Sequence, residues 1–339
     1  MKKFFAVLFA LLALAAGAAL LGIGVGGMVE HKEELLGDVK SLTNAAASKV
    51  SGTLNGLIVL TGEGKVIEES QIRSLLGSGI TGEGYEFDTD YYPYYAFLTE
   101  NEKAVYRQAY ANAAQYETTF LLSQNANAEE VERALDAFFY DHPELFWVET
   151  SYGYTYLVTG VCLQVTLQFN LTKDEIPAAR SAFDAAADEI LNAALRFGTE
   201  YEREKYVHDA LLQKTEYDSE AVFSQSAYSA LVLGRSVCAG YARAFQYLMC
   251  RMGIPTYYCT GTSEGSHAWH IVKLGGEYYN ADLTWDDSDP VSYYFFNRTD
   301  ADFAATHTRE GASLSLPACT ATQYRGLENN FGPGFFGYR

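Results

Sequence analysis

A cysteine, two histidines and an aspartate of the types that form a thiol catalytic site lie in two short stretches of the chain. Residues 236–241 read SVCAGY, and residues 265–287 read GSHAWHIVKLGGEYYNADLTWDD. A thiol becomes a strong nucleophile when a histidine takes its proton and a carboxylate orients that histidine. Such a group forms a thioester with an amide carbonyl, so the pattern predicts acyl transfer. Either His267 or His270 can be the base, and the fold decides which.

Cys238 is predicted to open a helix. The apolar residues after Ser236 recur at helical spacing up to Met252, and Gly253 followed by Ile-Pro ends the pattern. The first-turn N–H groups and the helix dipole favour a thiolate at this position. Gly240 weakens the helix but lets another backbone or a substrate approach it closely.

Three strands are predicted downstream of this helix. They cover residues 256–259, 267–274 and 277–285, and the last two alternate apolar and polar side chains. The pair Gly275-Gly276 between them is a strong hairpin signal. We therefore expect a small antiparallel sheet behind the helix that carries Cys238.

The length of this turn decides between the two histidines. With a two-residue turn, Trp269 faces Asp282 across the ladder, and alternation along the strand puts His267 on the same face. His270 then lies on the other face. A three-residue turn would reverse the parity and bring His270 to Asp282. Two adjacent glycines favour the two-residue turn, so we expect His267 to be the base that Asp282 orients.

The motifs VCAGYARAF, GIP, HAWHIV and ADLTWDD, in this order and spacing, resemble the core of the transglutaminase-like superfamily over roughly residues 200–290. The resemblance implies an α+β fold with a papain-like core, in which a helix bearing the cysteine packs on an antiparallel sheet. It also implies the catalytic triad Cys238, His267 and Asp282. Upstream, QSAYSALVLG, YYPYYAFL and DHPELFW are similar to segments of bacterial, exported members. Many members read HAWN where this chain reads HAWH, and by the parity above that position, His270, lies away from the triad.

Oxyanion donors are expected next to the thiol. The backbone N–H of Cys238 is one, and the side chain of Gln225 or Tyr228 is the second. No metal or cofactor is expected, because one cysteine with one histidine and one carboxylate lacks the paired spacing of structural zinc sites. Asp286 and Asp287 are expected in a solvated loop beyond the third strand, where a calcium-binding role stays open.

Other chemically capable residues are expected to be structural. His142 lies at a helix end, and His208 lies beside the apolar stripe of a helix. The chain has five cysteines, an odd number, so at least one lacks an intramolecular partner. Cys250 and Cys259 are close enough in sequence to pair but are expected to be buried thiols.

Composition divides the chain into five parts. Residues 1–29 form an apolar N-terminal segment, 30–90 a loosely ordered spacer, 91–170 a small accessory α+β unit, 171–325 the catalytic domain and 326–339 a flexible tail. The accessory unit is expected to contain two helices, the first opened by a capping box, and two or three antiparallel strands.

The N-terminal residues predict export. Lys2 and Lys3 precede a charge-free run over residues 4–29, and Glu30 follows it. This order of charges fits a signal peptide or a retained membrane helix, and so an extracellular or cell-surface protein with an N-terminus that associates with the membrane. The formal net charge of −19 argues against a nucleic-acid partner.

The expected activity is thiol acyl transfer on a protein or peptide substrate. A lysine amine as acceptor gives a transglutaminase, whereas water gives a deamidase or a cysteine protease, and the sequence leaves the acceptor open. A non-catalytic cell-surface binding module with the same fold is the other hypothesis that stays open.

Overall fold

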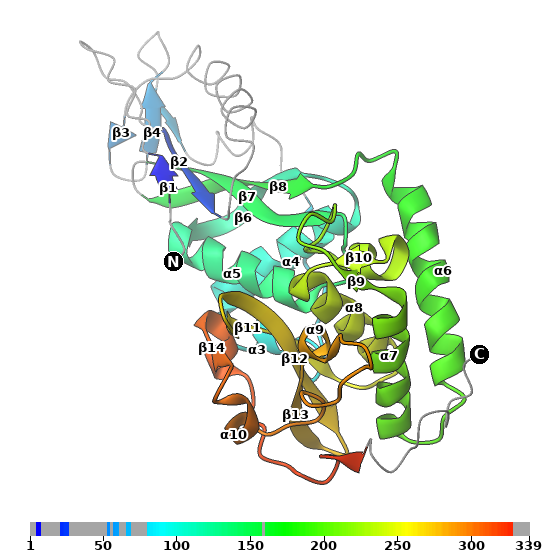
Figure 1. Cartoon of the computed structure of the whole chain (residues 1–339). Helices are drawn as coiled ribbons and strands as arrows, with labels where there is room; N and C mark the ends of the chain where they lie inside the picture. Colours follow the sequence, from blue (N-terminus) through cyan, green and yellow to red (C-terminus); the bar gives the residue numbers. More distant parts are fainter. Residues whose placement is uncertain are drawn as a thin grey trace. The chain divides into compact units, whose positions relative to one another are not determined.

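The computed structural model describes residues 80–157 and 160–327, and before residue 80 it describes the backbone of short strands only (Figure 1). The chain divides into two compact units. Unit 1 comprises Met1–Tyr85, Leu98–Phe138 and Val148–Phe169, and unit 2 comprises Glu86–Phe97, Phe139–Trp147 and Asn170–Arg339. Two segments of the predicted accessory unit, 91–97 and 139–147, therefore fold with unit 2.

Unit 1 is built on an antiparallel sheet with the strand order β1-β2-β7-β8-β6. Its strands are β1 (Phe5–Val7), β2 (Leu21–Gly26), β6 (Thr119–Asn127), β7 (Val148–Leu157) and β8 (Val161–Phe169). A second sheet contains β3 (Thr53–Leu54), β4 (Leu57–Leu60) and β5 (Val66–Glu68). The helix α4 (Glu100–Ala114) begins at the predicted capping box of Thr99 and Glu102, and α5 (Ala128–Asp141) follows β6 directly. The two helices and the antiparallel strands predicted here are confirmed.

The N-terminal helix predicted over residues 1–29 is not shown. The parts of that segment with an assigned backbone are the strands β1 and β2, and its remaining residues lie outside the described part of the chain, as do residues 328–339 of the predicted tail. Among the described residues, no helix has both the length and the apolar character to cross a membrane.

Unit 2 combines helices with a four-stranded antiparallel sheet of order β13-β12-β11-β14 (Figure 1). Its strands are β11 (Thr256–Thr262), β12 (Ser266–Leu274), β13 (Glu277–Ala281) and β14 (Thr308–Arg309), with a separate parallel pair of β9 (Glu216–Tyr217) and β10 (Arg235–Ser236). The helices are α3 (Pro93–Ala96), α6 (Ile176–Ala194), α7 (Glu200–Lys214), α8 (Cys238–Arg251), α9 (Leu283–Asp286) and α10 (Asp300–Phe303), with the π-helix η1 (Ser229–Leu233) and the 3₁₀-helix η2 (Gly311–Ser315). The expected mixture of helices and antiparallel sheet is confirmed.

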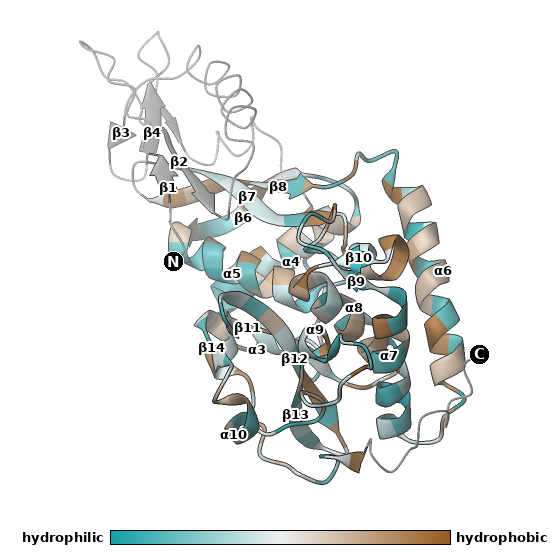
Figure 2. Cartoon of the chain, viewed as in Figure 1, coloured by the Kyte–Doolittle hydropathy of each residue, from teal (hydrophilic) through white to brown (hydrophobic). Residues whose placement is uncertain are grey.

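The helix α8 joins the sheet of unit 2 to the helices α6 and α7. It contacts β11 and β12 on one side and α6 and α7 on the other. Figure 2 shows that most residues of α7 are hydrophilic. In α8 nearly all residues are buried, including Tyr241, Phe245 and Leu248. It begins at Cys238, as predicted, and ends just before Gly253, whose φ of 79° is a left-handed conformation that terminates helices. The thiol of Cys238 therefore lies in the first turn of a helix that is almost entirely buried.

The hairpin between β12 and β13 has the predicted two-residue turn. Leu274 pairs with Glu277, so only Gly275 and Gly276 form the turn. Their φ angles of 58° and 88° are both positive, which glycine adopts without a steric penalty and which suits a tight hairpin. Further from the turn, His270 pairs with Ala281, which is the pairing predicted for a two-residue turn.

Gly240 is where another backbone approaches α8. A Cβ at this position would lie 1.9 Å from Ser236 Oγ, 2.7 Å from Ser229 Oγ and 2.8 Å from Ser224 O. These groups form their own network, in which the Ser229 and Ser236 hydroxyls bond each other and Ser236 Oγ donates to Ser224 O at 3.1 Å. The predicted close approach is confirmed, and it holds the loop before Cys238 against the helix.

We predict that Gly240→Ala lowers the free energy of unfolding by about 1–3 kcal/mol, because the new methyl group overlaps a buried hydrogen-bond network. Urea unfolding measures the change. Gly198→Ala is the matched control, since its Cβ would meet only Glu202 Oε2 at 3.8 Å. Equal stabilities of the two variants would contradict this reading of Gly240.

Candidate active site

His267 and Asp282 are in direct contact. His267 lies near the start of β12, and Asp282 follows the last residue of β13. The His267 Nε2 atom lies 2.6 Å from Asp282 Oδ2, and both side chains are buried. The hairpin parity predicted this contact, because a two-residue turn puts the two residues on one face of the sheet.

The Asp282 carboxylate accepts four hydrogen bonds. Its Oδ1 accepts from the backbone N–H groups of Thr284 at 2.9 Å and Trp285 at 3.2 Å, so Asp282 is also the N-cap of α9. Its Oδ2 accepts from His267 and from a second histidine, His307, at 2.9 Å. Burial by itself would raise the pKa of Asp282, but the bonds from both histidines outweigh it and hold the pKa at about 2. The group is therefore a buried carboxylate anion.

The pKa of the His267 imidazole responds to both Asp282 and Cys238. Burial opposes protonation of its imidazole, but hydrogen bonds to Asp282 and to Cys238 outweigh burial and raise the pKa of His267 to about 10. Because Nε2 is bonded to Asp282, Nδ1 is the ring atom left for the thiol. The ring is parallel to Trp269, with 6.1 Å between centroids. This arrangement favours an imidazolium beside Cys238.

Cys238 lies at the start of α8 and is half-buried, as is Cys250 near the end of the same helix, whereas Cys162, Cys259 and Cys319 are buried. All five cysteines are unpaired. Cys238 packs against an apolar cluster of Ala239, Ala242, Tyr258 and Ala268. Burial raises the pKa of the other four thiols, to about 12 in Cys162, Cys250 and Cys319 and well above its usual range in Cys259. Cys238 is therefore a half-buried thiol that lies close to His267.

His270 lies on the opposite face of the sheet, as predicted. Its Nδ1 is 2.8 Å from Ala281 O, and its ring packs on Phe245 of α8 with 4.6 Å between centroids. Burial lowers the pKa of His270 to about 4. The residue is therefore a neutral core histidine, and the HAWH departure leaves the His267 site intact.

The two side chains predicted as oxyanion donors lie on the segment that approaches α8. Gln225 is exposed and follows Ser224, whose carbonyl oxygen comes close to Gly240. The Tyr228 ring stacks on Phe146 with 4.9 Å between centroids. Gln225 therefore stays a predicted donor, whereas the ring of Tyr228 packs against Phe146, Phe183 and Phe223.

The expectation of a solvated Asp286 is wrong. Asp286 closes the single turn of α9, which directs it inward, and its side chain is fully buried. Its Oδ2 lies 3.5 Å from Nε2 of His208, and the other nitrogen of His208 lies 2.9 Å from Asp209 Oδ1. Burial opposes a charge on His208, but the bonds to Asp209 and Asp286 raise its pKa to about 9. Asp287, the second acid, accepts a 2.6 Å hydrogen bond from Tyr241.

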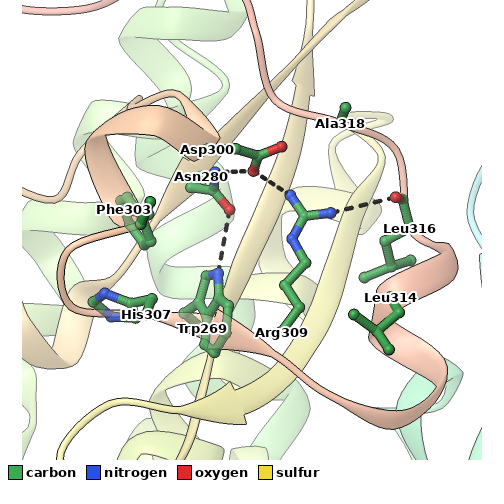
Figure 3. Close-up of a pocket in the computed structure, with 10 residues that line it drawn as sticks. Trp269, Asn280, Asp300, Phe303, His307, Arg309, Leu314, Leu316 and Ala318 are labelled. Atoms are coloured by element: carbon green, nitrogen blue, oxygen red, sulfur yellow. Dashed lines mark hydrogen bonds and ion pairs between the residues drawn. The ribbon is translucent and has the colours of Figure 1, made fainter.

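His307 is the site residue that the sequence did not reveal. It precedes β14, in a stretch that reads ADFAATHTRE and carries no motif around the histidine. Figure 3 shows it next to Trp269 and Phe303, at the edge of a cavity of about 340 Å³ that Arg309 also lines. One ligand atom from each of His267, Asp282 and His307 lies within 4.8 Å of the others, so these three groups can also hold a metal ion.

Comparison with known proteins supports the resemblance. Residues 191–283 match the family model of the Transglutaminase-like superfamily. This segment is transglutaminase-like. It contains α7, α8, β11 and β12, and with them Cys238, His267 and Asp282. His307 lies outside the match.

Two solved structures are similar to parts of the chain. One is a putative cysteine protease from Cytophaga hutchinsonii, with 20% identity over 40% of this chain and 54% of that one, at a TM-score of 0.28. The other is a TGase, with 12% identity over 64% of this chain and 57% of that one, at a TM-score of 0.30. The chain thus spans somewhat more than half of the length of each. No curated protein matches it significantly.

We predict that His270 makes this transglutaminase-like unit acid-sensitive. The unfolded chain binds a proton at His270 near pH 6.5, but the folded chain does so only near pH 4. Stability is therefore complete above pH 6.5 and falls as the pH drops toward 4, by on the order of 3 kcal/mol. Urea unfolding of wild type and His270→Asn at pH 6.5, 5.5 and 4.5 measures this, and the variant should lose less stability. Parallel curves would show that His270 is not buried in its neutral form.

Proposed function

We propose that this chain is a thiol enzyme that transfers the acyl group of a protein or peptide amide through a thioester on Cys238. The observation that carries the proposal is the 2.6 Å contact between His267 and Asp282, together with a Cys238 thiol close enough to His267 to raise its pKa. The cysteine at the start of a helix, with the histidine and the aspartate on an antiparallel sheet, corresponds to a papain-like core. The transglutaminase-like match over this segment supports the same chemistry.

The proposed reaction has two halves. His267 takes the proton of Cys238, and the thiolate attacks the amide carbonyl to form a tetrahedral oxyanion. The C–N bond then breaks, His267 donates its proton to the leaving nitrogen, and a thioester remains on Cys238. In the second half an acceptor attacks the thioester while His267 takes its proton, and the Cys238 thiolate leaves, which restores the pair of thiolate and imidazolium. Asp282 holds the imidazole in place and stabilises its charge throughout.

The oxyanion forms where α8 begins. The helix N-terminus directs backbone N–H groups toward a developing negative charge. Its N-cap, Val237, offers no side-chain cap for these groups, and Cys238 is the first helical residue. The backbone N–H of Cys238 therefore serves as one donor in the proposed mechanism, and Gln225 is the second candidate.

The substrate is proposed to be a polypeptide at the cell surface. Aromatic side chains lie close to the thiol. Tyr258 belongs to the cluster against which Cys238 packs, and the half-exposed Tyr217 is close enough for electrostatic interaction with Cys238. Such rings suit contact with peptide backbone and side chains. Export is proposed from the order of charges in residues 1–30 alone.

We predict that Cys238 reacts with iodoacetamide at pH 6 at least about tenfold faster in the wild type than in His267→Ala. The reason is that His267 stabilises the thiolate as one half of an ion pair. Mass spectrometry of the alkylated peptide measures the rate, and Cys238→Ala identifies any labelling of other thiols. His270→Asn is the matched control and should react at the wild-type rate within about threefold. Equal rates in wild type and His267→Ala would contradict the proposal.

We predict that the wild-type chain releases ammonia or a cleaved product from a peptide substrate, and that Cys238→Ala does not. A glutamine peptide with and without a primary amine distinguishes the acceptors. Ammonia with incorporation of the amine means a transglutaminase, ammonia alone a deamidase, and peptide cleavage a protease. If Cys238 is reactive but no product forms from a broad peptide library, the chain is a binding module and the proposal of an enzyme fails.

A further inference from the structure

His307 is the fourth donor to the carboxylate that orients His267. We propose that His307 is a positioning residue that fixes the Asp282 carboxylate, and through it His267, in the geometry needed for acyl transfer. The inference rests on the proposed function of Cys238, His267 and Asp282. It adds to that function a residue from a part of the chain beyond the transglutaminase-like match.

The first argument is the acceptor capacity of Asp282. A carboxylate offers about four lone-pair positions. Two backbone N–H groups occupy those of Oδ1, and the Nε2 atoms of His267 and His307 occupy those of Oδ2. Removing His307 would leave His267 as the sole side-chain donor on Oδ2, and the carboxylate could then rotate toward the vacated position. A small rotation of this kind misaligns the base, and misplacement by about 1 Å costs rate steeply.

The second argument is that both ring nitrogens of His307 have partners. Thr306 Oγ1 lies 2.8 Å from His307 Nδ1, and the same hydroxyl donates to Phe303 O at 3.3 Å. The other ring nitrogen, Nε2, lies 2.9 Å from Asp282 Oδ2. Contacts at both nitrogens therefore keep Nε2 of His307 directed at the carboxylate.

The third argument is that aromatic rings hold His307 in one orientation. The imidazole is buried, and rings surround it at centroid distances of 4.5–5.5 Å, from Phe303, Trp269, Trp285, Phe295 and His267 (Figure 3 shows Phe303 and Trp269). This enclosure keeps water from the Oδ2 side of Asp282. A hydrogen bond in such surroundings is stronger than one in water.

The fourth argument is that the segment bearing His307 is anchored to the sheet of the site. The next two residues form β14, in which Thr308 pairs with Thr262 and Arg309 with Gly261 of β11. The contact is so close that a Cβ at Gly261 would lie 1.9 Å from Thr308 O. Arg309 also bonds Asp300 of α10 at 2.5 Å. The backbone at His307 is thereby tied to the strand next to the one that carries His267.

The test compares variants that keep or remove the donor. His307→Leu keeps the bulk but removes the N–H group, whereas His307→Gln can place an amide N–H near the position of Nε2. We expect His307→Leu to lower kcat and the alkylation rate of Cys238 at pH 6 by about tenfold or more, with KM unchanged. His307→Gln should restore both rates to within about threefold of wild type. Thr306→Val, which removes only the hydroxyl, should give an intermediate loss.

The controls separate positioning from stability and from metal binding. His142→Leu removes another buried histidine that bonds one carboxylate, Glu144 Oε1 at 2.7 Å, and should lose stability without losing rate. Thermal unfolding of each variant shows whether it is folded under the assay conditions. Treatment of the wild type with EDTA should leave its rate unchanged, whereas a loss would mean that the three groups act through a metal and would overturn the proposal.

The outcomes are distinguishable from failure of the proposed function. If the wild type reacts but His307→Leu reacts equally fast, His307 does not position the triad. If His307→Leu and His307→Gln are equally slow while folded, the imidazole acts by packing and not as a donor, which also overturns the inference. If the wild-type Cys238 itself fails to react faster than in His267→Ala, the proposed function fails, and this inference falls with it.

Discussion

The site depends on a single buried anion, the carboxylate of Asp282. A buried charge costs several kcal/mol unless it is paired and hydrogen-bonded. Here the first turn of α9 supplies two N–H donors, β12 supplies His267, and the segment before β14 supplies His307. Folding of unit 2 therefore requires these elements to converge on Asp282, and the same convergence orients the base toward Cys238.

A second buried network secures the loop that follows the anion. His208 of α7 lies between Asp209 and Asp286, and Lys205 bonds both Asp209 and Tyr293 at 2.7 Å. This network joins α7 to Asp286 and to Tyr293, which lie on either side of residue 290. It explains how α7, mostly hydrophilic in Figure 2, can pack in the interior, since its charged side chains meet partners there. The position of α9, and with it the two N–H donors of Asp282, is held from this side.

The sequence alone predicts the contacts that depend on the geometry of a short turn and its two strands. Two glycines set a two-residue turn, and the alternation of side chains then placed His267 with Asp282 and His270 away from it. The His307 contact could not be predicted in this way, because an irregular path joins it to Asp282 and no periodic pattern constrains that path. The expectation of a solvated Asp286 fails because a strand continuing to residue 285 would place Asp286 in the following loop, whereas β13 ends at Ala281 and α9 turns Asp286 inward.

The most direct test of this account is the charge state of His267 at neutral pH, measured by ¹⁵N NMR of the histidine rings with His267→Gln to assign the signal. The account predicts that both ring nitrogens of His267 are protonated at pH 7 and that the ring loses one proton near pH 10. The ring of His270 should stay neutral down to about pH 4. A His267 signal that titrates near pH 6.5, as a free imidazole does, would contradict the account.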